Sequence, residues 1–232
     1  MSAPTVVLVH GAFADSSSWN GVIARLRADG HPVVAAANPL RGLASDAAYV
    51  ASVLRTVDGP VVLAGHSYGG SVITVAAAGQ PNVAALVYIA AFIPDSGESA
   101  LELTDKFPGS TLGPTTAPAD YPDGTELRIR QDEFPGQFAA DVDSAEAALM
   151  AVTQRPVALA ALQEGAEATA WRDLPSFALL TTADKNIPVA AQRFMAERAG
   201  ATSVEVEASH AVSVSRPDAV AELIGKAVAA VR

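Results

Sequence analysis

The stretch VVLAGHSYGGSVITVAAAG, residues 61–79, decides the fold of this chain. Its apolar start is typical of a buried strand, and the small apolar residues after position 70 are typical of a helix. Between them lies the pattern G-x-S-x-G at residues 65–69, with Ser67 at its centre. A strand, this tight turn and a helix together predict a nucleophile elbow, in which the serine oxygen projects beyond the sheet edge. Outside that setting the pattern would describe only a glycine-rich turn with an incidental serine.

Short β-branched runs alternate with alanine-rich stretches on both sides of this elbow. Strands are expected at residues 5–10, 32–37, 60–64, 85–91, 176–182 and 203–207, and helices at 18–29, 45–57, 68–79 and 189–199. A last helix is expected after Ser215, its N-cap, with Pro217 and Asp218 in the first turn. The alternation predicts the α/β class, with a mainly parallel sheet of about six strands flanked by helices.

Residues 95–173 break this alternation. They are rich in proline and acidic residues, and helical patterns are visible only at 144–153 and 156–164. We interpret them as a small helical cap inserted into a core made of residues 1–94 and 174–232. A disordered loop is the alternative, but the aromatic residues in this part indicate packing; they are Phe107, Tyr121, Phe134 and Phe138.

The composition disfavours several classes of protein. Half of the 232 residues are hydrophobic and 17% are charged, so one folded domain with its own core is expected. The net charge of −10 disfavours binding to nucleic acid or to an anionic membrane surface. The lack of cysteine rules out disulfides and thiolate metal sites. No signal peptide is visible before His10, and glycines and prolines interrupt the uncharged stretch 59–94, so we expect a cytoplasmic protein without a membrane span.

The hydroxyl of Ser67 is a weak nucleophile near neutral pH and needs a base, for which histidine is suited. Three of the four histidines are poorly placed: His10 follows a strand, His31 lies in a helix-to-strand loop, and His66 belongs to the elbow and is expected to point away from the serine. His210 follows the last predicted strand, at the carboxyl edge where ligand sites of such sheets gather. We therefore predict His210 as the base.

The base in turn needs a carboxylate that fixes its tautomer. Asp184 follows the fifth predicted strand by two residues and lies upstream of His210, so we predict that it fills this role. Asp95, after the fourth strand, is the alternative, and an ordinary loop position for Asp184 is also open. Asp173 precedes the fifth strand and is expected at the opposite edge.

Acyl transfer also requires N–H donors for the developing oxyanion. The residue after the nucleophile, Tyr68, is expected to supply one from its backbone. The second is expected from the loop after the first strand, where Gly11 lets the chain turn back and the N–H of Ala12 can face Ser67. Phe13 replaces Ala12 if that loop is shifted by one residue, and a plain glycine turn is the structural alternative.

Taken together, these segments resemble the α/β-hydrolase fold family. VLVHGAFADSSSW (7–19), GHSYGG (65–70), TTADKNIPVAAQRFMAE (181–197) and EASHAVSVSRPDAVAELI (207–224) occur in the family's order. The Pro-Asp-x-Gly segment at 94–97 is similar to that of the branch holding plant methylesterases, hydroxynitrile lyases and bacterial pyrethroid-hydrolase-like carboxylesterases. The resemblance implies a triad of Ser67, His210 and Asp184, oxyanion donors at Ala12 and Tyr68, no metal and no organic cofactor.

Two departures from the lyases of that branch bear on the reaction. Those lyases carry a lysine directly after the histidine of the triad, where this chain has Ala211, and a threonine in the first loop, where it has Gly11. Both differences favour ester hydrolysis. Since Ser67 occupies the elbow, relatives with an aspartate nucleophile are excluded.

We therefore expect a serine carboxylesterase that acts on a small, largely apolar ester through an acyl-enzyme. The aromatic residues expected to line its substrate pocket are Phe13, Phe92, Phe138 and Trp171. Lyase activity on cyanohydrins, cofactor-free perhydrolysis or halogenation, and a non-catalytic small-molecule sensor are the alternatives. A homodimer is compatible with the sequence, which does not fix the oligomeric state.

Overall fold

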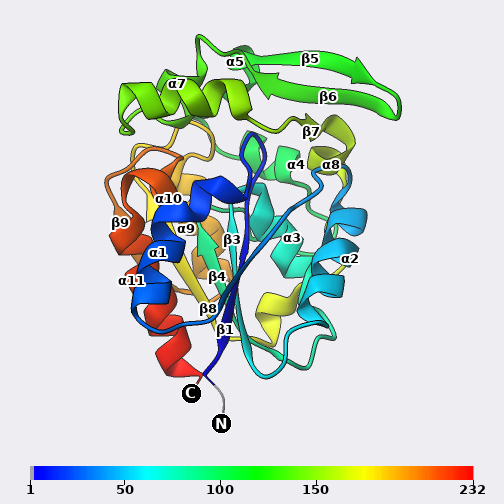
Figure 1. Ribbon diagram of the computed structural model, residues 1–232. Coiled ribbons are helices and arrows are strands. Elements are labelled where there is room, and N and C mark those ends of the chain that lie inside the picture. The colour runs from blue at the N-terminus through cyan, green and yellow to red at the C-terminus, as the bar shows by residue number, and fades with distance from the viewer. Residues whose placement is uncertain (1–2, 232) are drawn as a thin grey trace.

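A parallel six-stranded sheet forms the centre of the computed structural model, which describes residues 3–231 (Figure 1). Its strand order is β2-β1-β3-β4-β8-β9. The strands are β1 (Thr5–Val9), β2 (Val33–Ala36), β3 (Val61–His66), β4 (Val83–Ile89), β8 (Ser176–Thr181) and β9 (Thr202–Val206). Each predicted strand is confirmed with small shifts at its ends. Every residue of β3 is buried, as expected for a strand that is covered on both faces.

Helices cover both faces of this sheet because successive strand residues point to opposite sides. Val6 and Leu8 of β1 pack in one apolar layer with the helices α1 and α11, whereas Val7 and Val9 pack in the other with α2, α3 and α9. Figure 1 shows α1 and α11 on one side of the sheet and α2 and α3 on the other. These helices are α1 (Asn20–Ala28), preceded by the 3-10 turn η1 (Ser16–Trp19), α2 (Leu43–Leu54), α3 (Tyr68–Ala76), α9 (Val189–Arg198) and α11 (Pro217–Ala230).

The start of the last helix differs from the prediction. Ser215 is not its N-cap: it ends the short helix α10 (Val212–Ser215), where its N–H donates to the carbonyl of Ala211 at 3.0 Å. Because that turn runs on to Ser215, α11 begins only at Pro217 and is flanked by Arg216. Pro217 and Asp218 do lie in the first turn, and Asp218 pairs with Arg25 of α1.

The segment between β4 and β8 lies over the carboxyl ends of the central strands (Figure 1). It holds the helices α4 (Ala100–Asp105), α5 (Leu112–Thr115), α6 (Phe134–Phe138), α7 (Ser144–Thr153) and α8 (Leu159–Gln163), the turn η2 (Ala170–Arg172), and the strands β5 (Thr116–Tyr121), β6 (Gly124–Ile129) and β7 (Val157–Ala158). The three strands form an antiparallel sheet of their own, which the expected small helical cap did not include. The division of the chain at residues 94 and 174 stays a prediction.

The hairpin β5–β6 is the main feature of this segment that the sequence patterns missed. Its strands are half exposed and carry Pro118, so they lack the apolar run of a core strand. A signal was present in the turn, Pro122-Asp123-Gly124, whose last residue has φ 143°.

No helix among residues 3–231 combines the length and the apolar character needed to cross a lipid bilayer.

Candidate active site

Ser67 occupies a sharp turn between β3 and α3. Its backbone has φ 54° and ψ −125°, a strained conformation for a residue with a side chain. The turn requires glycine on both sides: a Cβ on Gly65 would lie 2.5 Å from the carbonyl oxygen of Gly69, and a Cβ on Gly69 would lie 2.5 Å from that of Val9. The predicted strand–turn–helix arrangement of the elbow is therefore present. The alternative, a glycine-rich turn with an incidental serine, does not describe this segment.

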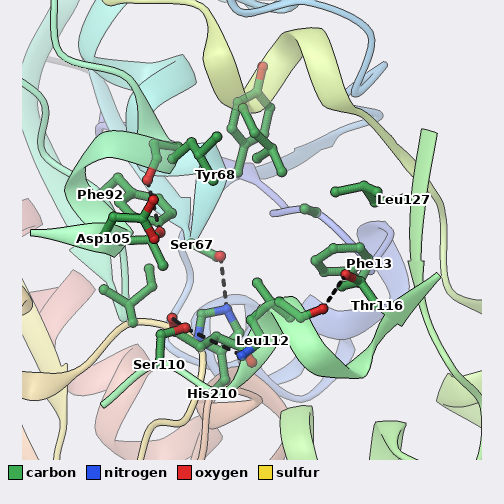
Figure 2. A pocket seen from close by; sticks show the side chains of 18 of the residues that line it. Phe13, Ser67, Tyr68, Phe92, Asp105, Ser110, Leu112, Thr116, Leu127 and His210 are labelled. Carbon is green, nitrogen blue, oxygen red and sulfur yellow. Dashed lines mark hydrogen bonds between the residues drawn. The ribbon is translucent and has the colours of Figure 1, made fainter. Parts of the chain in front are cut away.

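The side chains of Ser67, His210 and Asp184 lie in one hydrogen-bonded row. The hydroxyl of Ser67 is 2.8 Å from Nε2 of His210, and Nδ1 of His210 is 2.7 Å from Oδ2 of Asp184. Figure 2 shows the serine oxygen directed at the imidazole. His210 stands in the loop after β9 and Asp184 in the loop after β8, so the carboxyl ends of three strands in one sheet supply the row.

This row fixes the tautomer of His210. A carboxylate only accepts hydrogen bonds, so Nδ1 carries the proton and donates to Asp184, which leaves Nε2 free to accept from Ser67. The side chains of His210 and Asp184 are 1% and 0% exposed. Burial raises the pKa of Asp184, but His210 and the backbone N–H groups of Asn186 and Ile187 outweigh it, and the pKa lies below the ordinary value. Asp184 is thus a buried carboxylate that accepts a hydrogen bond from the imidazole of His210.

Four further groups hold the carboxylate of Asp184. Oδ1 accepts from the backbone N–H groups of Asn186 at 2.7 Å and Ile187 at 3.0 Å. Oδ2 accepts from the hydroxyl of Thr181 at 2.9 Å and from the side-chain amide of Gln192 at 3.1 Å. The sequence reasoning missed Thr181 and Gln192. For Gln192 a signal existed, because it is a polar residue on the buried face of α9.

Asp95, the alternative acid, lies elsewhere. Its carboxylate accepts from the guanidinium of Arg172 at 2.7 and 2.8 Å near the protein surface. That ion pair holds the pKa of Asp95 below its ordinary value. Asp95 therefore belongs to a surface pair, and Asp184 is the acid beside His210.

Two backbone N–H groups beside Ser67 are candidates for oxyanion donors. Tyr68 is the first residue of α3, so its N–H has no acceptor within the helix. Ala12 and Tyr68 both line the cavity above Ser67. The N–H of Phe13, by contrast, donates to the carbonyl of Arg155 at 3.1 Å, so it is not available to a substrate. This favours the predicted pair over the loop shifted by one residue.

A cavity of about 240 Å³ opens above Ser67. Phe13 and Phe92 line it as predicted, and Figure 2 shows them on opposite sides of the serine. Most of its wall comes from the segment between β4 and β8, which the sequence could not place. The residues missed by the prediction are Ala100, Leu101, Thr104, Asp105, Ser110, Leu112, Gly113, Pro114, Thr116, Leu127, Leu162, Asn186 and Ile187.

Phe138 and Trp171 do not line this cavity, and their assignment to the pocket is wrong. The ring of Phe138 packs edge-on against the imidazole of His210, with centroids 4.9 Å apart, and stacks on Phe134. Trp171 donates from its indole nitrogen to the carbonyl of Pro94 at 2.8 Å. Both aromatic side chains are therefore packing residues around the site.

Within residues 3–231, no group of three or more His, Cys, Asp or Glu side chains is arranged to hold a metal ion.

Comparison with known proteins places this fold in a family. The model of the alpha/beta hydrolase family matches residues 6–223. The chain belongs to the alpha/beta hydrolase family. A carbendazim hydrolyzing esterase from Nocardioides sp. (strain SG-4G) is 36% identical over 113 residues, which are 43% of this hydrolase and 47% of that relative. The match thus spans about half the length of the curated relative.

Solved structures share the whole architecture of this α/β hydrolase. A pyrethroid hydrolase from Sphingobium faniae JZ-2 superposes with a TM-score of 0.82 at 22% identity, over 99% of this chain and 98% of the other. A methylesterase, MES16 from Arabidopsis, superposes with a TM-score of 0.78 at 19% identity, over 97% and 99%. The predicted resemblance to the branch of plant methylesterases and pyrethroid hydrolases is confirmed. These two solved structures therefore share the fold of this hydrolase.

Proposed function

We propose that this α/β hydrolase is a serine carboxylesterase that cleaves small, largely apolar esters. The observation that carries the proposal is the row Ser67–His210–Asp184, with distances of 2.8 and 2.7 Å, at the floor of a mainly apolar cavity. A buried carboxylate, a correctly protonated imidazole and a strained serine form the arrangement that activates a hydroxyl as a nucleophile.

Each member of this row has its own role in acylation. The oxygen of Ser67 attacks the ester carbonyl carbon while Nε2 of His210 takes the hydroxyl proton. Asp184 stabilises the imidazolium, and the N–H groups of Ala12 and Tyr68 donate to the oxyanion. The bond from the carbonyl carbon to the alcohol oxygen then breaks, and the alcohol leaves with the proton from His210.

Deacylation repeats the sequence with water. Nε2 of His210 takes a proton from a water molecule, whose oxygen attacks the acyl carbon of the Ser67 ester. The oxyanion forms again at Ala12 and Tyr68. The bond to Ser67 breaks, His210 returns the proton to the serine, and the carboxylic acid leaves. No redox step or external proton carrier is needed.

The cavity supports the substrate class. Its walls carry mainly apolar side chains, and its volume of about 240 Å³ fits a small acyl or alcohol group better than a polymer. The curated relative is named for carbendazim hydrolysis, so carbendazim is one compound to test. Lyase chemistry is disfavoured, because Ala211 replaces the lysine and the ammonium of Lys185 donates to the carbonyl of Gly136 at 2.9 Å.

Labelling with a fluorophosphonate and turnover of nitrophenyl esters, from acetyl to octanoyl, test the proposal. The Ser67→Ala variant is expected to lose both. Ser71→Ala is a matched control, since Ser71 lies in α3 and its buried hydroxyl has no hydrogen-bond partner within the described residues. Full esterase activity in Ser67→Ala, or wild-type protein that neither reacts with the probe nor turns over any ester, would contradict it.

A further inference from the structure

A second buried imidazole lies against His210. His66 is the last residue of β3, directly before Ser67, and is 1% exposed. The centroids of the His66 and His210 rings are 4.8 Å apart. Nε2 of His66 is 2.8 Å from the backbone carbonyl oxygen of His210. The proposed ester mechanism assigns no role to this side chain.

The contact fixes the protonation of His66. A carbonyl oxygen only accepts, so Nε2 carries a hydrogen and donates it to His210. Burial, followed by the neighbouring imidazole of His210, lowers the pKa of His66 to about 3; Asp184 and His10 are the other titratable groups that act on it. The ring of His66 is therefore neutral at the near-neutral pH at which the proposed esterase acts. A neutral ring at this position does not oppose the imidazolium that forms on His210.

Packing holds the ring of His66 in one orientation. Trp19 meets it edge-on with centroids 6.3 Å apart, and Phe138 meets it at 6.1 Å and 78°. Nδ1 is buried and has no partner within residues 3–231, so Nε2 makes the directed contact of this ring.

The loop that carries His210 is hydrogen-bonded to two parts of the molecule. On the side of the inserted segment, the N–H of Ala211 donates to the carbonyl of Phe138 at 2.9 Å, and the hydroxyl of Ser209 bonds to Asp141. On the side of the sheet, His66 bonds the main chain of His210 itself. Since His66 is covalently joined to Ser67, this bond links the backbone of the base to the strand that carries the nucleophile.

We propose that His66 is a positioning residue, whose N–H to the carbonyl of His210 keeps the imidazole of His210 within hydrogen-bonding distance of Ser67 during turnover. The inference rests on the proposed esterase function. A displacement of the base by about 1 Å is enough to cost on the order of 10- to 100-fold in rate. The effect belongs in kcat, because His66 does not line the substrate cavity.

A matched pair of substitutions tests the role of the N–H. His66→Gln keeps a side-chain donor of similar reach, whereas His66→Met has a similar size and no donor. We expect His66→Met to lower kcat and the rate of fluorophosphonate labelling by about 10- to 100-fold with KM nearly unchanged, and His66→Gln to recover most of the loss. His31→Gln is the control, because His31 lies in the loop between α1 and β2, at the opposite edge of the sheet.

The outcome that overturns the inference is a folded His66→Met protein with wild-type kcat and labelling rate, or a His66→Gln protein as impaired as His66→Met. If His66→Met does not fold, ¹⁵N NMR of the histidine rings in the wild-type protein tests the proposed role of His66 instead. A proton on Nε2 of His66, coupled across the bond to His210, supports the role, and a proton on Nδ1 contradicts it. Wild-type protein whose Ser67 resists labelling refutes the esterase proposal instead, whatever the NMR spectrum shows.

Discussion

Gly11 packs so closely against Ser67 that a Cβ on residue 11 would lie 2.6 Å from the Cβ of the serine. The same atom would lie 2.8 Å from the carbonyl oxygen of His66, so neither neighbour could move away easily. The loop that carries Ala12 therefore reaches the nucleophile only because residue 11 has no side chain. A threonine at this position would have to displace the loop or the serine.

Gly11→Ala is expected to lower esterase activity sharply. The added methyl group would push Ala12 away from Ser67 and withdraw one proposed oxyanion donor, which is worth about 10²- to 10³-fold in kcat. Turnover of a nitrophenyl ester by the purified variant, with its melting temperature recorded alongside, measures the effect. Gly136→Ala is the control, because a Cβ there meets nothing within 4 Å. Unchanged kcat in Gly11→Ala would remove Ala12 from the proposed oxyanion hole.

Asp184→Asn is expected to lower kcat by about 10³- to 10⁴-fold. The amide of asparagine can donate to Nδ1 of His210, which places the imidazole proton on Nε2 and leaves no acceptor for the hydroxyl of Ser67. Asp95→Asn changes a surface ion pair with Arg172 and is expected to stay within about twofold of wild type. The same nitrophenyl assay compares the two variants. Equal losses of kcat in both variants would show that Asp184 has no special role in orienting His210.

The strand ends that carry these residues could be predicted because parallel strands leave a strong signal. Ser67, Asp184 and His210 each follow a short run rich in β-branched residues, and the carboxyl ends of parallel strands share one edge. The glycines around Ser67 were equally informative, because the backbone of the elbow leaves no space for a Cβ. The parallel sheet and the row of polar side chains at its carboxyl edge could be predicted from these local patterns, whereas the strand order was not.

The pocket could not be predicted in the same way. Its wall depends on how the segment between β4 and β8 folds over the sheet, and that segment contains a half-exposed hairpin with no apolar periodicity. Leu127 lines the cavity from β6, whereas the larger aromatic residues Phe138 and Trp171 pack beside it. Residue type alone does not distinguish an aromatic side chain in the core from one that faces a substrate.

Asp105 is expected to select against anionic substrates. Among the described residues that line the cavity, it alone carries an acidic side chain, and the neighbouring Lys106 is directed at Glu98, 3.5 Å away. Asp105→Asn should raise kcat/KM for a half ester with a free carboxylate by about three- to tenfold at low ionic strength, and much less at high salt. Activity on a neutral ester of equal size should stay unchanged. Asp123→Asn, in the turn between β5 and β6, is the control.

His66 should make the protein less stable as the pH falls below 6.5. Its pKa drops from the ordinary value of 6.5 to about 3 in the folded protein, so between these values the unfolded chain binds a proton that the native state does not. The free energy of unfolding therefore decreases toward low pH, and His66 contributes a slope that approaches about 1.4 kcal/mol per pH unit.

Urea unfolding at several pH values between about 4.5 and 7 measures this slope, because that range includes the ordinary histidine pKa. His66→Gln, which cannot titrate, should show a smaller dependence on pH than wild type, whereas Ser71→Ala, which changes no titratable group, should keep the wild-type dependence. His10, whose pKa burial also lowers, adds a term of the same sign that remains in both variants. Identical slopes for His66→Gln and wild type would mean that His66 takes up a proton in the folded protein, and the neutral donor to His210 would then be ruled out.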